Sequence, residues 1–470
     1  MGRKHDRPFF ENIEVTAAAS KGKSIGRAPD GRVILISNAV PGDWVSVQIY
    51  KKRKGMYEGL ATEITRPSAD RITPKCIHFG TCGGCKWQNM AYPAQLKHKA
   101  TEVTENLRRI GKLELPEVNP IIGAPNIFYY RNKMEFSFSS QRWLEPEEME
   151  SGEPITDRNA LGLHIPGMWD KILDLKGCHL QADPSNKIRL AVRDYALKNN
   201  LTFFDPRQQV GMLRSLMIRN TAAGDFMVLL QCYQDEPEAR EGLLNFLAVT
   251  FPEIKSLHYT INPKANDTIY DLDLVCFKGL PYLTESMEDL KFQITPKSFY
   301  QTNSEQALVL YRIVRDLAGL TGSELVYDLY TGLGTIAQFI APKAKKVIGI
   351  EAVPEAIEAA KINAEYNGLT HLEFFAGDMK AIFTANFLAE HGNPDVIITD
   401  PPRDGMHKDV VAQILEIAPN RIVYVSCNSA TQARDLQLMK SHYQIEVVQP
   451  VDMFPQTHHV ENVVLLSRII

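Results

Sequence analysis

The sequence predicts an α/β protein whose C-terminal part is a doubly wound, Rossmann-like sheet. An apolar run from Glu324 to Leu329 stops at the loop Tyr330-Thr331-Gly332-Leu333-Gly334. A helical stretch begins near Thr335, and a second apolar run, Val347 to Ile350, ends on Glu351. A strand, a glycine loop, a helix and a second strand that ends on an acid make up half of a nucleotide-binding sheet.

The glycine loop indicates which ligand this sheet would hold. Glycines let the backbone approach a ligand closely, and Glu351 can accept hydrogen bonds from two ribose hydroxyls. A dinucleotide-binding loop should read G-x-G-x-x-G, whereas this loop has only Gly332-Leu333-Gly334. The shorter loop fits S-adenosylmethionine, which has no pyrophosphate to hold.

Three later strands are also predicted to end on polar residues. They follow a helix over Glu355–Asn367 and cover Leu372–Phe375, Asp395–Thr399 and Arg421–Val425. Their ends read Gly377-Asp378, Asp400-Pro401-Pro402-Arg403 and Ser426-Cys427-Asn428. Ligands of open α/β sheets bind at the carboxyl ends of the strands, so these motifs are predicted to converge on one site. Asp378 stands where an adenine amino group would be bound.

The composition is that of an ordinary globular protein of two to four domains. The chain has 470 residues, of which 44% are hydrophobic and 23% are charged. The N-terminus lacks the apolar core of a signal peptide, and no apolar run has the length of a membrane span. We therefore expect a soluble, cytoplasmic protein with no membrane partner. The net charge of -4 does not by itself indicate a nucleic-acid binder.

Residues 1–66 are predicted to form a small antiparallel barrel of the oligonucleotide-binding type, because short β-rich runs alternate with turns. The runs are Asn12–Ala18, Arg32–Ile36, Trp44–Tyr50 and Glu58–Thr65. The basic sequence Lys51-Lys52-Arg53-Lys54 falls between two of them, where a loop would present it to RNA phosphates. A structural barrel with a solvated loop explains the same pattern equally well.

Four cysteines form a metal-ligand pattern. Cys76, Cys82 and Cys85 lie close together around Gly83-Gly84, and Cys178 follows far downstream. Thiolates hold zinc and iron–sulfur clusters equally well, so the spacing does not choose between them. Chance free thiols are the weaker alternative, because this glycine-containing loop cannot form a hydrophobic core. The other two cysteines outside the C-terminal sheet, Cys232 and Cys276, are interpreted as core residues.

Cys427 is the residue that selects a reaction. A cysteine after an apolar strand is more often inert packing than a nucleophile. Between Ser426 and Asn428, however, its side chain is expected to turn toward a ligand. A thiolate beside a methyl donor can add to C6 of a pyrimidine and make C5 nucleophilic. A base must then remove the C5 proton, and Glu461, at the start of the last apolar strand, is the candidate. Its alternative interpretation is an exposed strand acid.

These motifs resemble the bacterial RNA uracil-5-methyltransferases over nearly the whole chain. The most specific matching pieces are Phe299-Tyr300-Gln301-Thr302-Asn303, Asp328-Leu329-Tyr330, Gly349-Ile350-Glu351, Asp400-Pro401, Val423–Asn428 and Met453–Glu461. The resemblance implies that Cys427 is the nucleophile and Glu461 the base. It implies S-adenosylmethionine contacts from six residues. They are Gln301, Tyr330, Thr335, Glu351, Asp378 and Asp400.

The resemblance also implies a division into three domains. Residues 1–66 would be a TRAM domain, an RNA-binding barrel, and residues 67–285 a central α/β domain. Residues 286–470 would be the methyltransferase domain, onto which a helix over residues 93–112 would pack. The central domain would hold a 4Fe-4S cluster, whose ligands would be Cys76, Cys82, Cys85 and Cys178.

The expected partner is RNA rather than DNA. With both a TRAM domain and a cluster, the chain resembles the enzymes of 23S ribosomal RNA more than the transfer RNA enzyme, which lacks both. Three alternatives stay open: a transfer RNA substrate, methyl transfer to a cytosine or an exocyclic nitrogen, and a non-catalytic iron–sulfur protein that binds RNA. The sequence does not predict the oligomeric state or the target uridine.

Overall fold

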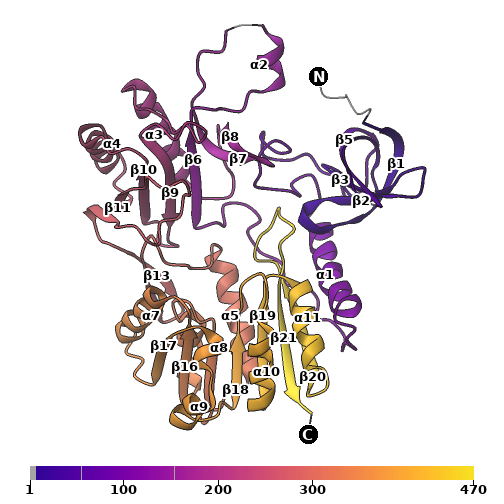
Figure 1. Cartoon of the computed structure of the whole chain (residues 1–470), viewed down its shortest axis with the longest axis vertical. Helices are drawn as coiled ribbons and strands as arrows, with labels where there is room; N and C mark the ends of the chain where they lie inside the picture. Colours follow the sequence, from indigo (N-terminus) through magenta and orange to yellow (C-terminus); the bar gives the residue numbers. More distant parts are fainter. Residues whose placement is uncertain (1–6, 54, 153, 470) are drawn as a thin grey trace.

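The structure is a computed structural model that describes residues 7–53, 55–152 and 154–469. Figure 1 shows three parts: an N-terminal barrel, a central sheet, and a C-terminal sheet that carries helices on both faces. Among the helices of the described residues, none is long and apolar enough to cross a membrane.

The N-terminal part is a closed barrel of five strands in the order β1-β2-β3-β5-β4. The bounds are β1 Phe9–Ala18, β2 Ser24–Arg27, β3 Val33–Ser37, β4 Trp44–Arg53 and β5 Met56–Arg66. The barrel prediction is confirmed, although β3 and β5 pair in parallel rather than antiparallel and β2 was not among the expected strands. The basic run was expected in a loop, but residues 51–53 continue strand β4, and Lys54 lies outside the described residues. The exposed side chains of residues 51–53 therefore lie at the end of β4, where it pairs with β5.

The central part is a seven-stranded sheet in the order β12-β11-β10-β9-β6-β7-β8. Its strands are β6 Lys133–Ser139, β7 Ala160–Ile165, β8 Met168–Asp174, β9 Leu213–Asn220, β10 Phe226–Cys232, β11 Ile254–Ile261 and β12 Val275–Gly279. The helices of this part are α2 Pro146–Glu150, α3 Ser185–Lys198 and α4 Pro237–Thr250. Helices α3 and α4 share one apolar core with the sheet. Cys232 is buried in it as expected, but Cys276 is exposed because edge strand β12 has little cover.

The C-terminal sheet has the order β17-β16-β15-β18-β19-β21-β20, in which β21 alone runs antiparallel to the other strands. Its strands are β15 Leu325–Leu329, β16 Lys346–Glu351, β17 Leu372–Ala376, β18 Val396–Thr399, β19 Arg421–Ser426, β20 Tyr443–Val451 and β21 Glu461–Arg468. Its helices are α5 Ser304–Ala318, α6 Thr335–Ile340, α7 Pro354–Tyr366, α8 Met379–Ile382, α9 Ala385–His391, α10 Lys408–Ile417 and α11 Ser429–Met439. The predicted doubly wound fold is confirmed.

Strand alternation gives this sheet two apolar faces. Val326 joins a core with helices α5, α6 and α7, whereas its neighbour Tyr327 joins a core with α10 and α11. The second core also receives Val103 and Leu107 of helix α1, Tyr92–Arg109, so α1 packs on the C-terminal sheet. Figure 1 shows α1 beside α11 and below the barrel. Parts of the chain that are distant in sequence therefore meet around this sheet.

A short hairpin joins the central and C-terminal parts. Strand β13, Leu283–Met287, pairs with β14, Leu290–Ile294, and the predicted domain boundary at residue 286 falls inside β13. Leu283 packs against the central sheet, whereas Phe292 belongs to the core of the C-terminal sheet. The hairpin thus belongs to both parts.

Candidate active site

The sheet register brings the predicted site residues to one edge. In the antiparallel pair β19–β21, Ser426 lies opposite Asn462, so the adjacent residues Cys427 and Glu461 lie at the same end of this strand pair. In the parallel pairs, Leu329 lies opposite both Ile350 and Thr399. The residues that follow these strands therefore meet at their carboxyl ends, as the sequence predicts.

The glycine loop is built to approach a ligand. Tyr330, Gly332 and Gly334 all have positive φ angles, 64°, 56° and 69°, which turn the backbone sharply between β15 and α6. A Cβ at Gly334 would lie 2.7 Å from the ring of Phe374, so this position requires glycine. The Glu351 carboxylate accepts hydrogen bonds from the N–H groups of Gly332 at 3.2 Å and Val353 at 3.0 Å. Glu351 is thereby held beside the loop, where a ribose would lie.

Asp328 lies beside the glycine loop and was not among the residues predicted to bind the cofactor. Its carboxylate accepts hydrogen bonds from the Thr331 hydroxyl at 2.5 Å and from the Ala337 N–H at 3.1 Å. The other oxygen, Oδ1, is buried and has no partner among the described residues. Burial and the nearby Glu351 raise its pKa to about 7. A buried acid two residues before a glycine loop was the available signal.

The other predicted cofactor contacts lie around the loop. Asp378 is exposed and caps helix α8 by accepting the Lys380 N–H at 2.9 Å, and its charge acts on Tyr330. Thr335 begins helix α6, as predicted, and its hydroxyl lies 3.1 Å from that of Tyr311. Gln301 precedes helix α5, and its backbone carbonyl accepts a hydrogen bond from Asn132 at 2.8 Å. Nothing in these contacts prevents the three side chains from binding a cofactor.

Cys427 lies in a turn that is fixed from both sides. Its neighbour Asn428 caps helix α11 through the Ala430 N–H, and its side-chain NH₂ donates to the Arg403 carbonyl at 2.9 Å. This second bond holds the Asp400–Arg403 loop against the cysteine turn. The half-buried thiol has a pKa raised to about 11 by burial and by the charges of Glu461 and Asp400, whereas Arg403 lowers it. The thiol therefore keeps its proton near neutrality.

Glu461 and Asp400 form a pair of interacting carboxyl groups. Glu461 is only 5% exposed. Burial raises the pKa of both groups; Asp400 raises that of Glu461 further, and Asp328 raises that of Asp400. Two neighbouring carboxylates cannot both ionise readily, so this pair can hold a proton near neutrality. Arg403 opposes the shift in Glu461.

Two neutral histidines precede Glu461. Burial and nearby cations lower the pKa of His458 to about 4 and that of His459 to about 3. The nitrogen Nδ1 of His458 lies next to Gly22 of the barrel, at 3.5 Å from where a Cβ on that glycine would stand. The barrel therefore reaches the loop that carries the candidate base.

The four predicted metal ligands lie in one region. Cys82, Cys85 and Cys178 pack against the same core, and the charges of Cys76 and Cys178 act on both Cys82 and Cys85. The N–H of Gly84 donates to Sγ of Cys82 at 3.4 Å. Within the described ranges, however, no group of three or more Cys, His, Asp or Glu residues could hold a metal ion. The metal assignment stays a prediction.

The chain matches known proteins over nearly its full length. Residues 281–469 match the family tRNA (Uracil-5-)-methyltransferase, and residues 11–60 match the TRAM domain. A relative from Bacteroides thetaiotaomicron, called an uncharacterized RNA methyltransferase, is 55% identical over 96% of this chain and 99% of its own. A second relative of that description, from Porphyromonas gingivalis, is 52% identical over 97% and 99%. This chain belongs to the TRAM-containing RNA uracil-5-methyltransferase family.

A solved structure matches the whole architecture of this uracil-5-methyltransferase. The tRNA (uracil-54, C5)-methyltransferase of Pyrococcus abyssi, in complex with S-adenosyl-L-homocysteine, is 25% identical. It has a TM-score of 0.74 and covers 97% of this chain and 100% of its own. The protein is an enzyme that methylates RNA with S-adenosylmethionine, which excludes the non-catalytic alternative.

Proposed function

We propose that this enzyme methylates C5 of a uridine in RNA through a covalent bond to Cys427. The observation that carries the proposal is that the charge of Glu461 acts on the Cys427 thiol, beside the register pair Ser426 and Asn462 at the end of β19. Methylation of an exocyclic nitrogen needs neither group. A cytosine-directed enzyme would need this pair too, but the family points to uracil.

The reaction follows from these two side chains. The Cys427 sulfur adds to C6 of the uracil and leaves an enolate whose C5 carbon is nucleophilic. C5 then attacks the methyl carbon of the sulfonium, and the carbon–sulfur bond electrons leave with S-adenosylhomocysteine. Glu461 takes the C5 proton, the C5–C6 double bond re-forms, and Cys427 is expelled as a thiolate. Because the thiol is protonated in the free protein, the Asp400 carboxylate, whose charge also acts on it, is assigned to accept its proton when uracil binds.

Cofactor binding is assigned to the edge of the sheet. We propose that Glu351 holds the ribose and Asp378 the adenine, while Gln301, Tyr330 and Thr335 line the pocket. The unpartnered, buried Oδ1 of Asp328 supports a further contact there, because a buried acceptor without a partner is costly. Asp400 interacts electrostatically with Asp328 and with Glu461. We therefore propose that it both contacts the cofactor and raises the pKa of the base.

We further propose that the four cysteines hold a 4Fe-4S cluster. Their grouping in one region and the Gly84 N–H bond to a cysteine sulfur support a thiolate-ligated site. Thiolates hold zinc equally well, so the cluster is favoured over zinc only because of the resemblance to the uracil-5-methyltransferases. Methyl transfer from a sulfonium consumes no electrons, so the cluster would have a structural role. It would anchor the loop through its four ligands, Cys76, Cys82, Cys85 and Cys178.

The RNA substrate we favour is 23S ribosomal RNA, acted on in the cytoplasm. The barrel and the cysteine set support it, because the resemblance implies that the bacterial transfer RNA enzyme lacks both. A transfer RNA substrate is the second candidate, favoured by the full-length match to the Pyrococcus abyssi tRNA enzyme. Mass spectrometry of 5-methyluridine in both RNAs, from cells with and without the gene, decides between them. Loss from ribosomal RNA alone is the expected result, and loss from neither would refute the proposed function.

A further inference from the structure

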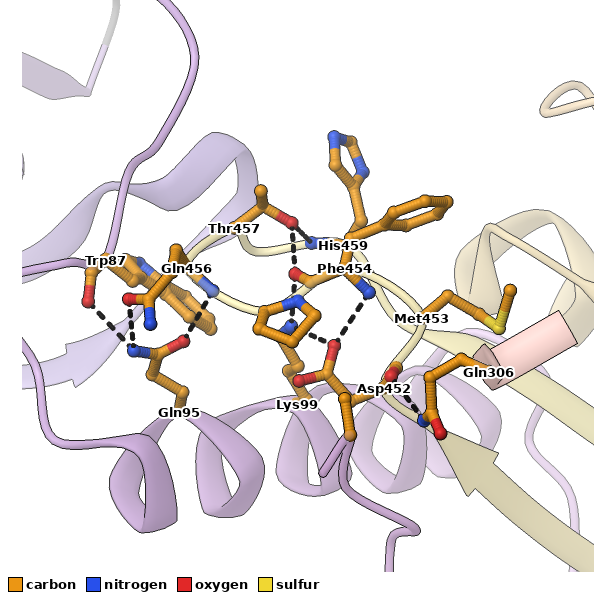
Figure 2. Close-up of polar contacts among 12 residues, drawn as sticks. Trp87, Gln95, Lys99, Gln306, Asp452, Met453, Phe454, Gln456, Thr457 and His459 are labelled. Carbon is orange, nitrogen blue, oxygen red and sulfur yellow. Dashed lines mark hydrogen bonds and ion pairs between the residues drawn. The ribbon is translucent and has the colours of Figure 1, made fainter. Parts of the chain in front are cut away.

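The loop between β20 and β21 carries the chain into Glu461, and the backbone of its residues 452–456 is held by contacts from outside the loop. Its polar contacts come from helix α1, helix α5 and the segments around residues 87 and 130. Figure 2 shows the loop crossing α1, with Gln306 reaching it from α5. The carbonyl contacts are Gln306 to Asp452 at 2.7 Å, Asn303 to Met453 at 2.9 Å, Tyr130 to Pro455 at 2.9 Å and the Trp87 N–H to Gln456 at 3.0 Å.

A fully buried ion pair lies at the centre of this loop. Nζ of Lys99 on helix α1 lies 2.6 Å from Oδ1 of Asp452, and both side chains are 0% exposed. Lys99 also donates to the Phe454 carbonyl at 3.1 Å. The Asp452 carboxylate accepts the Phe454 N–H at 3.0 Å and the Tyr92 hydroxyl at 2.9 Å. The pair therefore fixes the loop backbone as well as its own side chains (Figure 2).

One helical turn earlier, Gln95 makes a second, reciprocal contact. Its NH₂ donates to the Gln456 side-chain oxygen at 3.1 Å, and its own oxygen accepts the Gln456 N–H at 3.0 Å. Gln456 has a φ of 67°, a left-handed conformation that is unfavourable for a residue other than glycine. Helix α1 therefore holds a strained backbone five residues before the candidate base.

Stability is a weak explanation for the ion pair. Burying two charges costs free energy that their attraction offsets only in good geometry, and apolar replacements are often equally stable. Burial itself lowers the pKa of Lys99, although Asp452 opposes this shift. The Lys99–Asp452 pair lies in the loop that leads to the Glu461 carboxylate. Its free-energy cost is therefore better explained by the loop geometry that it fixes.

We propose that Lys99 is a positioning residue for Glu461, acting through Asp452 and the Phe454 carbonyl. This inference rests on the proposed function, in which Glu461 removes the C5 proton. The nucleophile is positioned differently, because the Cys427 turn is held by Asn428 and helix α11. Loss of the ion pair should therefore disturb the base more than the nucleophile.

Adduct formation depends on the nucleophile Cys427, and adduct decay depends on the base Glu461. Measuring the two rates therefore shows which residue a substitution disturbs. A displacement of about 1 Å at a reacting group can cost about 100-fold in rate. We expect Lys99→Met to form the covalent RNA adduct at nearly the normal rate and to release methylated RNA at least about tenfold more slowly. The adduct should then accumulate on a denaturing gel.

The test is a single-turnover time course with RNA and S-adenosylmethionine, which measures adduct formation and adduct decay separately. Lys97→Met is the matched control, because Lys97 is exposed on the same helix. The double variant Lys99→Met with Asp452→Asn leaves no unpaired buried charge, so it keeps the test valid if the single variant unfolds. Slow decay with normal formation, in the single variant or the double, is the expected result.

Two results would overturn the inference. One is decay at the control rate in a folded variant that lacks Lys99. The other is equal slowing of formation and decay, which is the behaviour of a general loss of stability. If the unsubstituted enzyme forms no adduct at Cys427, the proposed function itself fails, and this outcome is visible in the same gel.

Discussion

Replacing Glu461 by glutamine should separate the two halves of the reaction most clearly. Glutamine keeps the size of the side chain but cannot accept the C5 proton. It also removes a charge that raises the pKa of the Cys427 thiol, so addition to C6 should not become harder. The variant should therefore accumulate enzyme bound covalently to methylated RNA.

The magnitude follows from the loss of a positioned base. Such a loss costs about 10² to 10⁴ in rate, equivalent to about 3 to 5 kcal/mol of transition-state stabilisation. Glu461 is 5% exposed, so water has little access to replace it. Adduct decay slowed by this factor, at unchanged adduct formation, would trap the species for a denaturing gel.

The pH dependence of the same step gives an independent check. Burial and Asp400 raise the pKa of Glu461 above its ordinary value. Because a base must be ionised to act and the pKa of Glu461 is raised to about 8, turnover of the unsubstituted enzyme should decrease as the pH falls through this value, and the residual rate of Glu461→Gln should lack that limb. Normal turnover by Glu461→Gln, or no adduct while Cys427 is intact, would refute this assignment of the base.

Three further predictions concern the rest of the molecule. Protein purified without oxygen should be brown and contain iron, and Cys178→Ala should remove the colour; a colourless protein with one bound zinc would contradict the cluster. The double variant Lys51→Ala, Lys52→Ala should weaken binding to all RNA sequences and reduce the salt slope by about 1.4; unchanged affinity at low salt would make these residues solvated surface. Asp43→Ala should lower the free energy of unfolding by about 3 kcal/mol in urea titrations, since the buried carboxylate pairs with Arg71 at 2.6 Å and accepts the Val40 N–H at 2.6 Å; an unchanged urea midpoint would refute that value.

The position of the candidate site at the carboxyl ends of the strands could be predicted, because short sequence motifs determine it. Parallel strands end on the same edge, so acids and a cysteine at successive strand ends must converge. The glycine loop, the start of helix α6 and strand β19 all lie within a residue or two of their predicted positions. Strand β2 was missed because it is four residues long and contains Gly26, which leaves little pattern to detect.

Contacts between residues that are distant in the chain could not be predicted from the sequence. Lys99 reads as one more cation of a helix that faces solvent, and Asp452 as a loop acid, until the fold brings them together across 353 positions. The same holds for the hairpin β13–β14, whose residues pack in two different cores. Such pairings depend on tertiary packing that no local periodicity encodes.

The most direct test of the reaction is tritium release from RNA whose uracil carries tritium at C5. The account predicts that tritium enters water only when S-adenosylmethionine is present, in step with methyl incorporation, and that Cys427→Ala abolishes both. Methyl incorporation without tritium release would contradict it, because C5 could not then be the methylated atom.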